Sequence, residues 1–367
     1  MRFPEFSGEW ETKSINDLAD VIGGGTPDTT VKSYWDGGIQ WFTPSEIGKN
    51  KFVDASLRTI TEDGLNNSSA KLLPPNTILL SSRATIGECS LSLRECATNQ
   101  GFQSLVSKKC NVDFLYYLIQ TKKKDLIRKS CGSTFLEISA NEVRKIQVSV
   151  PSDVEQQKIA GLLSLIDKRI ATQNKIIEDL KKLKSAITDL LFHSIADAHT
   201  IRLGKIAHIT NGAGDVQDAN TEHQEDWYPF FDRSEELKWF PTYSFDKEAV
   251  IYAGEGQSFY PRYYNGKFAL HQRCYAITDF ASCIIPKYCY HFMNTLNSYF
   301  VRNSVGSTVP SLRMDIFQKV EIRLPPIPKQ QHICKIIDAF YTKLEVEQRG
   351  ISILQELKQF LLSQMFI

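Results

Sequence analysis

The sequence lacks the features that would place the protein in a membrane, in a secreted compartment or around a metal ion. No apolar run reaches the roughly eighteen residues of a membrane span, and the first residues contain no secretion signal. The eight cysteines form no Cys-x-x-Cys pair, and the seven histidines show no ligand spacing. We therefore expect a cytoplasmic protein with reduced thiols, no membrane partner and no metal site.

Motifs of the common catalytic sites are also missing. The sequence contains no Gly-x-x-x-x-Gly-Lys-Ser/Thr phosphate loop, no His-Glu-x-x-His and no Gly-x-Ser-x-Gly. The Asp/Asn-Pro-Pro-Tyr motif of adenine methyltransferases is absent as well. The glycine-rich stretch at 23–27 lacks the lysine of a nucleotide loop, so it predicts a turn. These absences favour a protein without catalytic residues of its own.

Charge of either sign is not in excess. The chain has 43 basic and 42 acidic side chains among 367 residues, a formal net charge of +1. A nucleic-acid partner is therefore neither required nor excluded, and binding one would require basic residues sorted onto one face. The length and the 42% hydrophobic content fit two or three domains with separate cores.

An internal repeat organises the chain at a constant offset of 174 residues. The stretch at 128–134, Arg-Lys-Ser-Cys-Gly-Ser-Thr, returns at 302–308 as Arg-Asn-Ser-Val-Gly-Ser-Thr. Pro151 returns as Pro325, and the Gln-Gln pair at 156–157 returns at 330–331. The offset needs no gap, so the two copies predict two similar structural units.

The same offset continues through two segments with apolar residues at alternating steps of three and four. This heptad pattern predicts two long helices that pack on each other. One polar residue, Lys184 or Lys358, interrupts the apolar seam of each copy. The seam residues of the two helices are Leu163, Ile166, Ile170, Ile177, Leu180, Lys184, Ile187 and Leu191, then Ile337, Phe340, Leu344, Ile351, Leu354, Lys358, Leu361 and Met365.

If a pseudo-two-fold axis relates the copies, the helices run antiparallel as a coiled coil. A 29-residue seam is about 43 Å long, which makes a stiff spacer. Full overlap would bring Lys184 near Leu344 and Lys358 near Ile170. The simpler alternative is that each helix is an ordinary amphipathic helix of its own domain. At the start of the first helix, Ser152 and Glu155 predict a capping box, which Lys329 removes in the second copy.

The remaining sequence predicts two globular regions of mixed α and β structure. Runs at 77–80 and 249–252 favour strands, and 112–124 and 286–300 favour helices. A final strand at 146–150 or 320–324 follows each Gly-Ser-Thr loop. The fold class is therefore α/β (mixed α+β). Its four parts are 1–150 and 198–325, which are globular, and 151–197 and 326–367, which are helical.

Polar, aromatic and basic residues gather in the predicted loops of both globular regions. Arg, Asn, Gln, Ser and Thr pair with base edges in the major groove, and several of them also bind phosphates. For any single residue, capping of a turn is the simpler explanation. The candidates for nucleic-acid contact are Thr26, Thr29, Trp41, Thr43, Ser45, Ser82, Arg83, Asn99, Gln100, Ser133, Thr134, Asn211, Arg233, Ser234, Tyr260, Arg262, Gln272, Arg273, Ser307 and Thr308.

The ordered set of motifs resembles the specificity subunit of type I restriction-modification systems. The opening Arg-Phe-Pro-Glu-Phe-Ser-Gly-Glu-Trp at 2–10, Gly-Gly-Gly-Thr-Pro at 23–27 and Arg-Ala-Thr-Ile-Gly at 83–87 are similar to the family's first recognition domain. The stretch Tyr-Pro-Phe-Phe-Asp-Arg-Ser at 228–234 resembles a second domain type. The two Gly-Ser-Thr…Pro…Gln-Gln frames are similar to its domain-to-helix junctions. The likeness covers nearly the whole chain.

This resemblance implies two target-recognition domains, each reading half of a two-part double-stranded DNA target, and two helices that act as a ruler. It implies two adenine-N6 methyltransferase subunits and two restriction/translocase subunits as partners. S-adenosylmethionine, ATP and Mg would be used by those partners, and this chain would need no cofactor of its own. Two other functions stay open: a module serving a fused nuclease–methyltransferase, and a coiled-coil protein–protein adaptor without a DNA role. An enzyme with an unfamiliar site is a third.

Overall fold

The computed structural model describes residues 2–132, 136–193, 195, 198–306 and 308–366. The chain divides into two compact units, Met1–Lys175 with Arg349–Ile367 (unit 1) and Ile176–Gln348 (unit 2). Each unit is a globular region with parts of two long helices, so the mixed α and β prediction is confirmed. The predicted four-part division places its boundaries differently, because each long helix contributes to both units. No helix in the described residues is long and apolar enough to cross a membrane.

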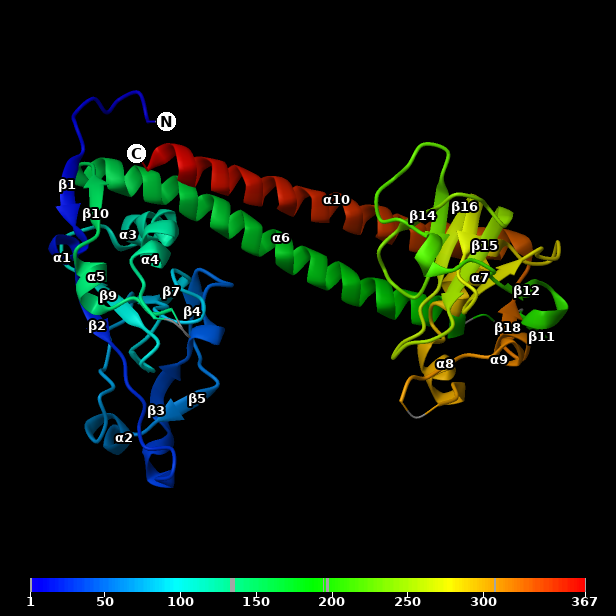
Figure 1. Cartoon of the computed structure of the whole chain (residues 1–367), viewed down its shortest axis with the longest axis horizontal. Helices are drawn as coiled ribbons and strands as arrows, with labels where there is room; N and C mark the ends of the chain where they lie inside the picture. The colour runs from blue at the N-terminus through cyan, green and yellow to red at the C-terminus, as the bar shows by residue number, and fades with distance from the viewer. Residues whose placement is uncertain (1, 133–135, 194, 196–197, 307, 367) are drawn as a thin grey trace. The chain divides into compact units, whose positions relative to one another are not determined.

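The strands of unit 1 form a two-stranded, a five-stranded and a three-stranded sheet. The two-stranded sheet pairs β1 (Glu11–Ser14) with β10 (Gln147–Val150), which lie side by side in Figure 1. The five-stranded order is β2 (Ala19–Gly23), β9 (Gln103–Ser107), β6 (Ile78–Leu80), β7 (Cys89–Ser92) and β4 (Phe52–Val53). The three-stranded order is β5 (Arg58–Ile60), β3 (Trp35–Phe42) and β8 (Cys96–Thr98).

Helices cover one side of the core of unit 1. Helix α3 begins after its N-cap Asn111, whose side chain accepts from the backbone N–H of Phe114 at 3.0 Å. All its residues from Phe114 to Ile119 are buried, and they pack with the first turns of α6. The helices are α1 (Ile15–Leu18), α2 (Glu62–Asn66), α3 (Val112–Thr121), α4 (Lys123–Arg128) and α5 (Ala140–Arg144), with 3-10 turns η1 (Lys32–Tyr34) and η2 (Pro44–Glu46).

Unit 2 gathers most of its strands into one six-stranded sheet. Its order is β12 (His208–Asn211), β17 (Cys274–Thr278), β15 (Phe245–Ala253), β16 (Arg262–Leu270), β13 (Tyr228–Phe231) and β14 (Lys238–Phe240). A separate pair joins β11 (His199–Arg202) to β18 (Glu321–Leu324). The helices are α7 (Pro286–Met293), α8 (Asn297–Asn303) and α9 (Met314–Gln318), with 3-10 turns η3 (Leu203–Lys205) and η4 (Val216–Asp218).

The two units share one strand plan, although their sheets are divided differently. In unit 1, β3 pairs with β8 in parallel, and in unit 2, β13 pairs with β16 in parallel. Strands β7 and β8 are separated by three residues, whereas β16 runs without a break through both roles. The extra sheet of unit 1 is therefore an interruption of the same plan.

Buried glutamines anchor the start of both long helices in the same way. The Gln156 carboxamide accepts from the Asn111 N–H at 3.0 Å and donates to the Pro151 carbonyl at 3.0 Å. Gln330, 174 residues later, accepts from the Ile285 N–H at 2.9 Å and donates to the Pro325 carbonyl at 2.8 Å. Neither side chain is more than 3% exposed, so the repeated Gln marks a structural anchor.

The predicted capping box at the first long helix is not what Glu155 forms. Its carboxylate is 1% exposed and accepts two hydrogen bonds from the Arg2 guanidinium, both 2.7 Å long. A paired arginine stabilises a buried carboxylate more than a backbone N–H does. The opening residues of the chain are thereby tied to the helix.

Helices α6 (Asp153–His193) and α10 (Ile327–Met365) pack antiparallel in the parts that each unit contains. All sixteen predicted seam side chains are buried or half-buried. The register differs from full overlap by about one turn. In unit 1 the Lys358 ammonium pairs with Asp167 at 2.8 Å, and in unit 2 the Lys184 ammonium lies 4.0 Å from the centre of the Tyr341 ring. Each partner lies three residues before the one expected.

Candidate functional site

Three loops of unit 1 meet where strands β2, β3 and β8 end. The Asn99 N–H donates to the carbonyl of Phe42 at 3.1 Å, and the Gly25 N–H donates to the carbonyl of Thr98 at 2.8 Å. Thr26 Oγ1 donates to Gln100 Oε1 at 2.5 Å across the same junction. These contacts bring together candidates that lie far apart in the sequence. We call them the first loop surface: Thr26, Thr43, Ser45, Asn99 and Gln100.

Glycine is required where these loops approach each other. A Cβ on Gly24 would lie 2.1 Å from the carbonyl oxygen of Asn99, and one on Gly25 would lie 2.2 Å from Ser69 Oγ. The glycine-rich stretch is therefore a place of close backbone packing. The prediction of a turn there agrees with this geometry.

Thr43 and Ser45 are held in place by local hydrogen bonds. Glu46 accepts from the Thr43 N–H at 2.8 Å and from its hydroxyl at 2.7 Å, which closes a capping box around η2. The Thr43 and Ser45 hydroxyls are 3.1 Å apart. Both hydroxyls are oriented by this turn while Ser45 remains exposed.

Two candidates of unit 1 are packed inside rather than displayed. Trp41 is 4% exposed, and its indole N–H donates to the Gly25 carbonyl at 2.9 Å. Ser82 is fully buried. Their expected direct contact with nucleic acid does not agree with this burial, because the strand β3 and the segment after β6 point them into the core. They support the loops instead.

The other candidates of unit 1 surround the first loop surface less closely. Arg83 pairs with Glu137 at 2.8 Å and is 42% exposed, so its guanidinium is partly engaged. Thr29 is exposed. Ser133 and Thr134 lie outside the described residues.

Unit 2 repeats the same junction with different side chains. The His271 N–H donates to the Phe231 carbonyl at 3.0 Å, and the Gly214 N–H donates to the Leu270 carbonyl at 3.0 Å. By these contacts, His271 and Gln272 occupy the places of Asn99 and Gln100. A Cβ on Gly212 would lie 2.0 Å from the Leu270 carbonyl oxygen, as crowded as Gly24. We call the second loop surface Asn211, Arg233, Ser234, His271 and Gln272.

A buried carboxylate shapes the loop after β13. Asp232 is 4% exposed, accepts from the Ser234 N–H at 2.8 Å and its hydroxyl at 2.6 Å, and pairs with Lys238 at 2.6 Å. Burial opposes its ionisation, but the hydrogen bonds from Lys238 and Ser234 outweigh burial and lower the pKa of Asp232. The Arg262 guanidinium donates to the carbonyls of Asp232 and Ser234. Arg262 thus orients this loop from behind.

The exposed candidates of unit 2 remain at the surface. Asn211 Nδ2 donates to the Gln272 carbonyl at 3.4 Å, while the side chains of Gln272 and Arg233 are exposed. Arg273 pairs with Glu255 at 2.8 Å, and Tyr260 is 57% exposed. Thr308 is exposed, and Ser307 lies outside the described residues.

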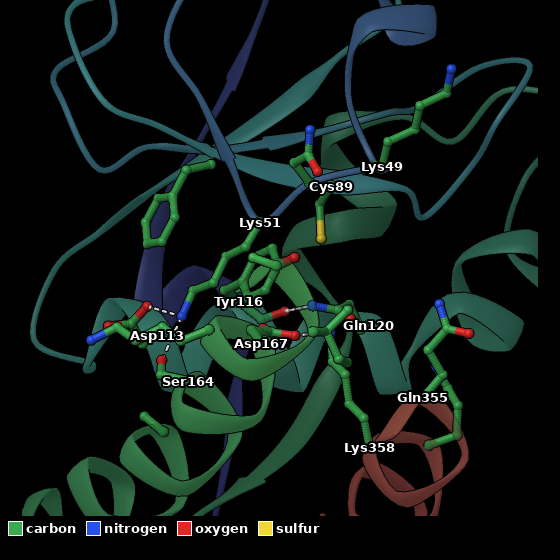
Figure 2. Close-up of a pocket in the computed structure, with 18 of the residues that line it drawn as sticks. Lys49, Lys51, Cys89, Asp113, Tyr116, Gln120, Ser164, Asp167, Gln355 and Lys358 are labelled. Atoms are coloured by element: carbon green, nitrogen blue, oxygen red, sulfur yellow. Dashed lines mark hydrogen bonds and ion pairs between the residues drawn. The ribbon is translucent and has the colours of Figure 1, made fainter. Parts of the chain in front are cut away.

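A cavity of about 950 Å³ in unit 1 is lined by residues that the sequence did not single out. Figure 2 shows Lys51 reaching toward Asp113 and Ser164 inside it, with Tyr116, Asp167 and Lys358 around the same space. The loop before β4, helix α3 and both long helices supply these side chains. No group of three His, Cys, Asp or Glu residues in the described parts of the chain could hold a metal ion.

Comparisons with known proteins give a consistent set of similarities. The family model described as type I restriction modification DNA specificity domain matches residues 7–182 and 196–359. The MjaIX specificity subunit of Methanocaldococcus jannaschii is 28% identical, over 97% of this chain and 92% of that protein. The EcoR124I/EcoR124II specificity subunit of Escherichia coli is 31% identical over 48% of this chain and 44% of that protein.

A solved structure shares the fold along the whole chain. The S subunit of the type I restriction-modification system of M. genitalium superposes with a TM-score of 0.64 at 16% sequence identity. The superposition covers 100% of this chain and 99% of that one. The arrangement of globular regions and long helices is therefore one that known proteins adopt.

Proposed function

This chain belongs to the family of type I restriction-modification DNA specificity domains, and we propose that it reads a two-part DNA sequence, one half with each loop surface. The resemblance inferred from the sequence motifs is confirmed by that membership. The observation that carries the proposal is the repeated junction of loops, which holds Asn99 and Gln100 in unit 1 and His271 and Gln272 in unit 2. One backbone arrangement presenting two sets of polar side chains suits the reading of two different half-sites.

The side chains of the two surfaces have the chemistry that base edges require. Asn and Gln can bind adenine through two hydrogen bonds, Arg binds guanine, and Ser and Thr accept or donate to either. Each such contact contributes about 1–3 kcal/mol of discrimination between bases. Since Glu46 and Asp232 orient the loops before any DNA arrives, little ordering cost remains for binding.

In this proposal, α6 and α10 set the gap between the half-sites. A helix of 41 residues extends about 62 Å at 1.5 Å per residue, a stiff element of the size needed to span a DNA spacer. The spacer itself carries no information for this chain, because no loop reads it.

The partners in this proposal are two adenine-N6 methyltransferase subunits and two restriction/translocase subunits. Both helices carry exposed apolar side chains that support docking of other chains. In unit 2 these are Ile176, Leu183 and Leu190, every seventh residue of α6, and in unit 1 they are Ile353, Leu357 and Phe360 on α10. S-adenosylmethionine, ATP and Mg act in the partners, and this chain contributes recognition in the cytoplasm without a catalytic step of its own.

Mapping of methylated adenines by long-read sequencing tests the proposal. The full chain is expressed with a candidate methyltransferase partner in a host that lacks adenine methylation. We expect one motif made of two short defined halves around an undefined gap. The absence of any motif, with a partner that is active alongside another specificity chain, would contradict the proposal and favour the adaptor function.

A further inference from the structure

A buried polar cluster in unit 1 connects its globular region to both long helices. Lys51, 8% exposed, donates to Ser164 Oγ on α6 at 2.6 Å and to the Tyr117 hydroxyl on α3 at 3.1 Å. Tyr117 donates to Asp167 on α6 at 2.6 Å, and Asp167 pairs with Lys358 on α10 at 2.8 Å. We call these five residues the first junction. Figure 2 shows several of them around one cavity.

Unit 2 has a cluster at the same positions of the repeat. His291 Nε2 lies 2.9 Å from Asp338 Oδ1, and Lys287 pairs with Asp338 at 2.8 Å. Tyr341 stacks on His291 with ring centres 5.9 Å apart, and the Lys184 ammonium lies over the Tyr341 ring. These five residues form the second junction, in which α7, α10 and α6 meet.

Adding 174 to the positions of the first junction reproduces most of the second. Tyr117 becomes His291, Ser164 becomes Asp338 and Asp167 becomes Tyr341, while Lys184 becomes Lys358. The positions stay polar although nearly every residue type has changed. Since three of the four pairs differ in chemistry, common ancestry of the sequence alone does not account for the buried contacts. They were rebuilt in each unit.

The apolar seam cannot select one register by itself. Leu and Ile recur every three or four residues on both helices, so a slip of one heptad would again set apolar against apolar. The same slip would bring Lys358 opposite Ala160 or Asn174, where the Asp167 carboxylate is out of reach. A buried ammonium group without a partner is strongly disfavoured, which is how buried polar residues specify register.

We infer that the two junctions are the positioning elements that fix the register of α6 on α10 and the seat of each globular region on the helices. This inference rests on the proposed function, since it assigns to the junctions the choice of spacer length between the half-sites. The seam then supplies stability, while Lys184 and Lys358 supply selectivity.

The test is the double variant Lys184→Met/Lys358→Met in the full complex with its methyltransferase partner. Methionine preserves the unbranched stem and removes the charge, so we expect unchanged or higher thermal stability. Methylation at sites whose spacer is one to three base pairs longer or shorter is expected to rise at least tenfold relative to the preferred spacer. The sequences of both half-sites should not change.

Two matched variants make the result specific. Lys184→Arg/Lys358→Arg keeps both charges and should preserve the spacer preference. Lys182→Met removes an exposed lysine of α6 that pairs with Glu178, and it should behave like the unmodified chain. A Met double variant that folds and keeps the original spacer preference would overturn the inference, while a missing motif with the unmodified chain would instead contradict the proposed function.

Discussion

Units 1 and 2 have the same framework and different surfaces. The hydrogen bond from the Asn99 N–H to Phe42 has its counterpart from the His271 N–H to Phe231, and the two distances differ by only 0.1 Å. Around that shared backbone, a threonine capping box in one unit is replaced by a buried Asp232–Lys238 pair in the other. The comparison teaches that the scaffold preserves where a loop is held and leaves free what the loop displays.

The comparison would break most completely if the helices did not set the gap. We expect removal of residues 173–179 together with 346–352 to shorten the recognised spacer by about three base pairs. Seven helical residues span about 10.5 Å, and both junctions keep their opposing partners because the cuts lie between them. Methylome mapping measures the spacer. An unchanged spacer in an active complex would contradict the ruler.

Crowding each loop junction should disable one unit at a time. Gly24→Ala places a methyl group against the Asn99 carbonyl, and Gly212→Ala places one against the Leu270 carbonyl. We expect each variant to lower the free energy of unfolding by about 1–3 kcal/mol, measured by urea denaturation. Methylation should lose selectivity in one half-site only. Gly161→Ala, where a Cβ meets nothing within 4 Å, is the control.

Removing one polar side chain from each surface should have a smaller and local effect. Gln100→Ala and Gln272→Ala are each expected to relax base preference at one position of their own half-site by about 1–3 kcal/mol. Methylation frequencies over all single-base variants of the motif give this number. Arg94→Ala, which removes an exposed ion pair with Asp54, should leave both half-sites unchanged. Relaxation of both half-sites by one variant would argue against independent reading.

The smallest expected difference between the units is their response to acid. Burial lowers the pKa of His291 against the opposing effect of Asp338, whereas burial raises the pKa of Tyr117 at the equivalent position. A lowered histidine pKa stabilises the fold above the unfolded value of about 6.5, and this contribution is lost as the pH falls below it.

We therefore expect the free energy of unfolding of unit 2 to decrease by at most about 1.4 kcal/mol per pH unit below pH about 6.5. Hydrogen exchange of α7 against α3 follows the two units in one sample. His291→Gln should flatten the response of α7. An equal response of α3 and α7 would show that this histidine is not the cause.

The elements with local periodicity could be predicted from the sequence. The heptads located α6 and α10, and apolar runs located parts of β6, β10, β15 and β18. The register was wrong by about one turn, because the prediction assumed full overlap of the seams. What decides the register is the position of Asp167 and Tyr341 relative to the two lysines, and these residues lie outside the seam.

The candidate surface was only partly visible in the sequence. Composition suggested Asn99 and Gln100, but their approach to Thr26 depends on the parallel pairing of β3 with β8, a contact between distant segments. The same composition also selected Trp41 and Ser82, whose burial depends on strand orientation. The junctions were missed because residues of the repeat such as Tyr117 and His291 share a position without sharing a residue type.

The most direct test of one scaffold reading two targets is an exchange of residues 198–325 for the second domain of a relative with a different motif. Adenine methylation is then mapped in the complex with the unchanged partner. The account predicts that one half-site changes to that of the donor while the other half-site and the spacer length stay the same. A change in both half-sites would contradict it.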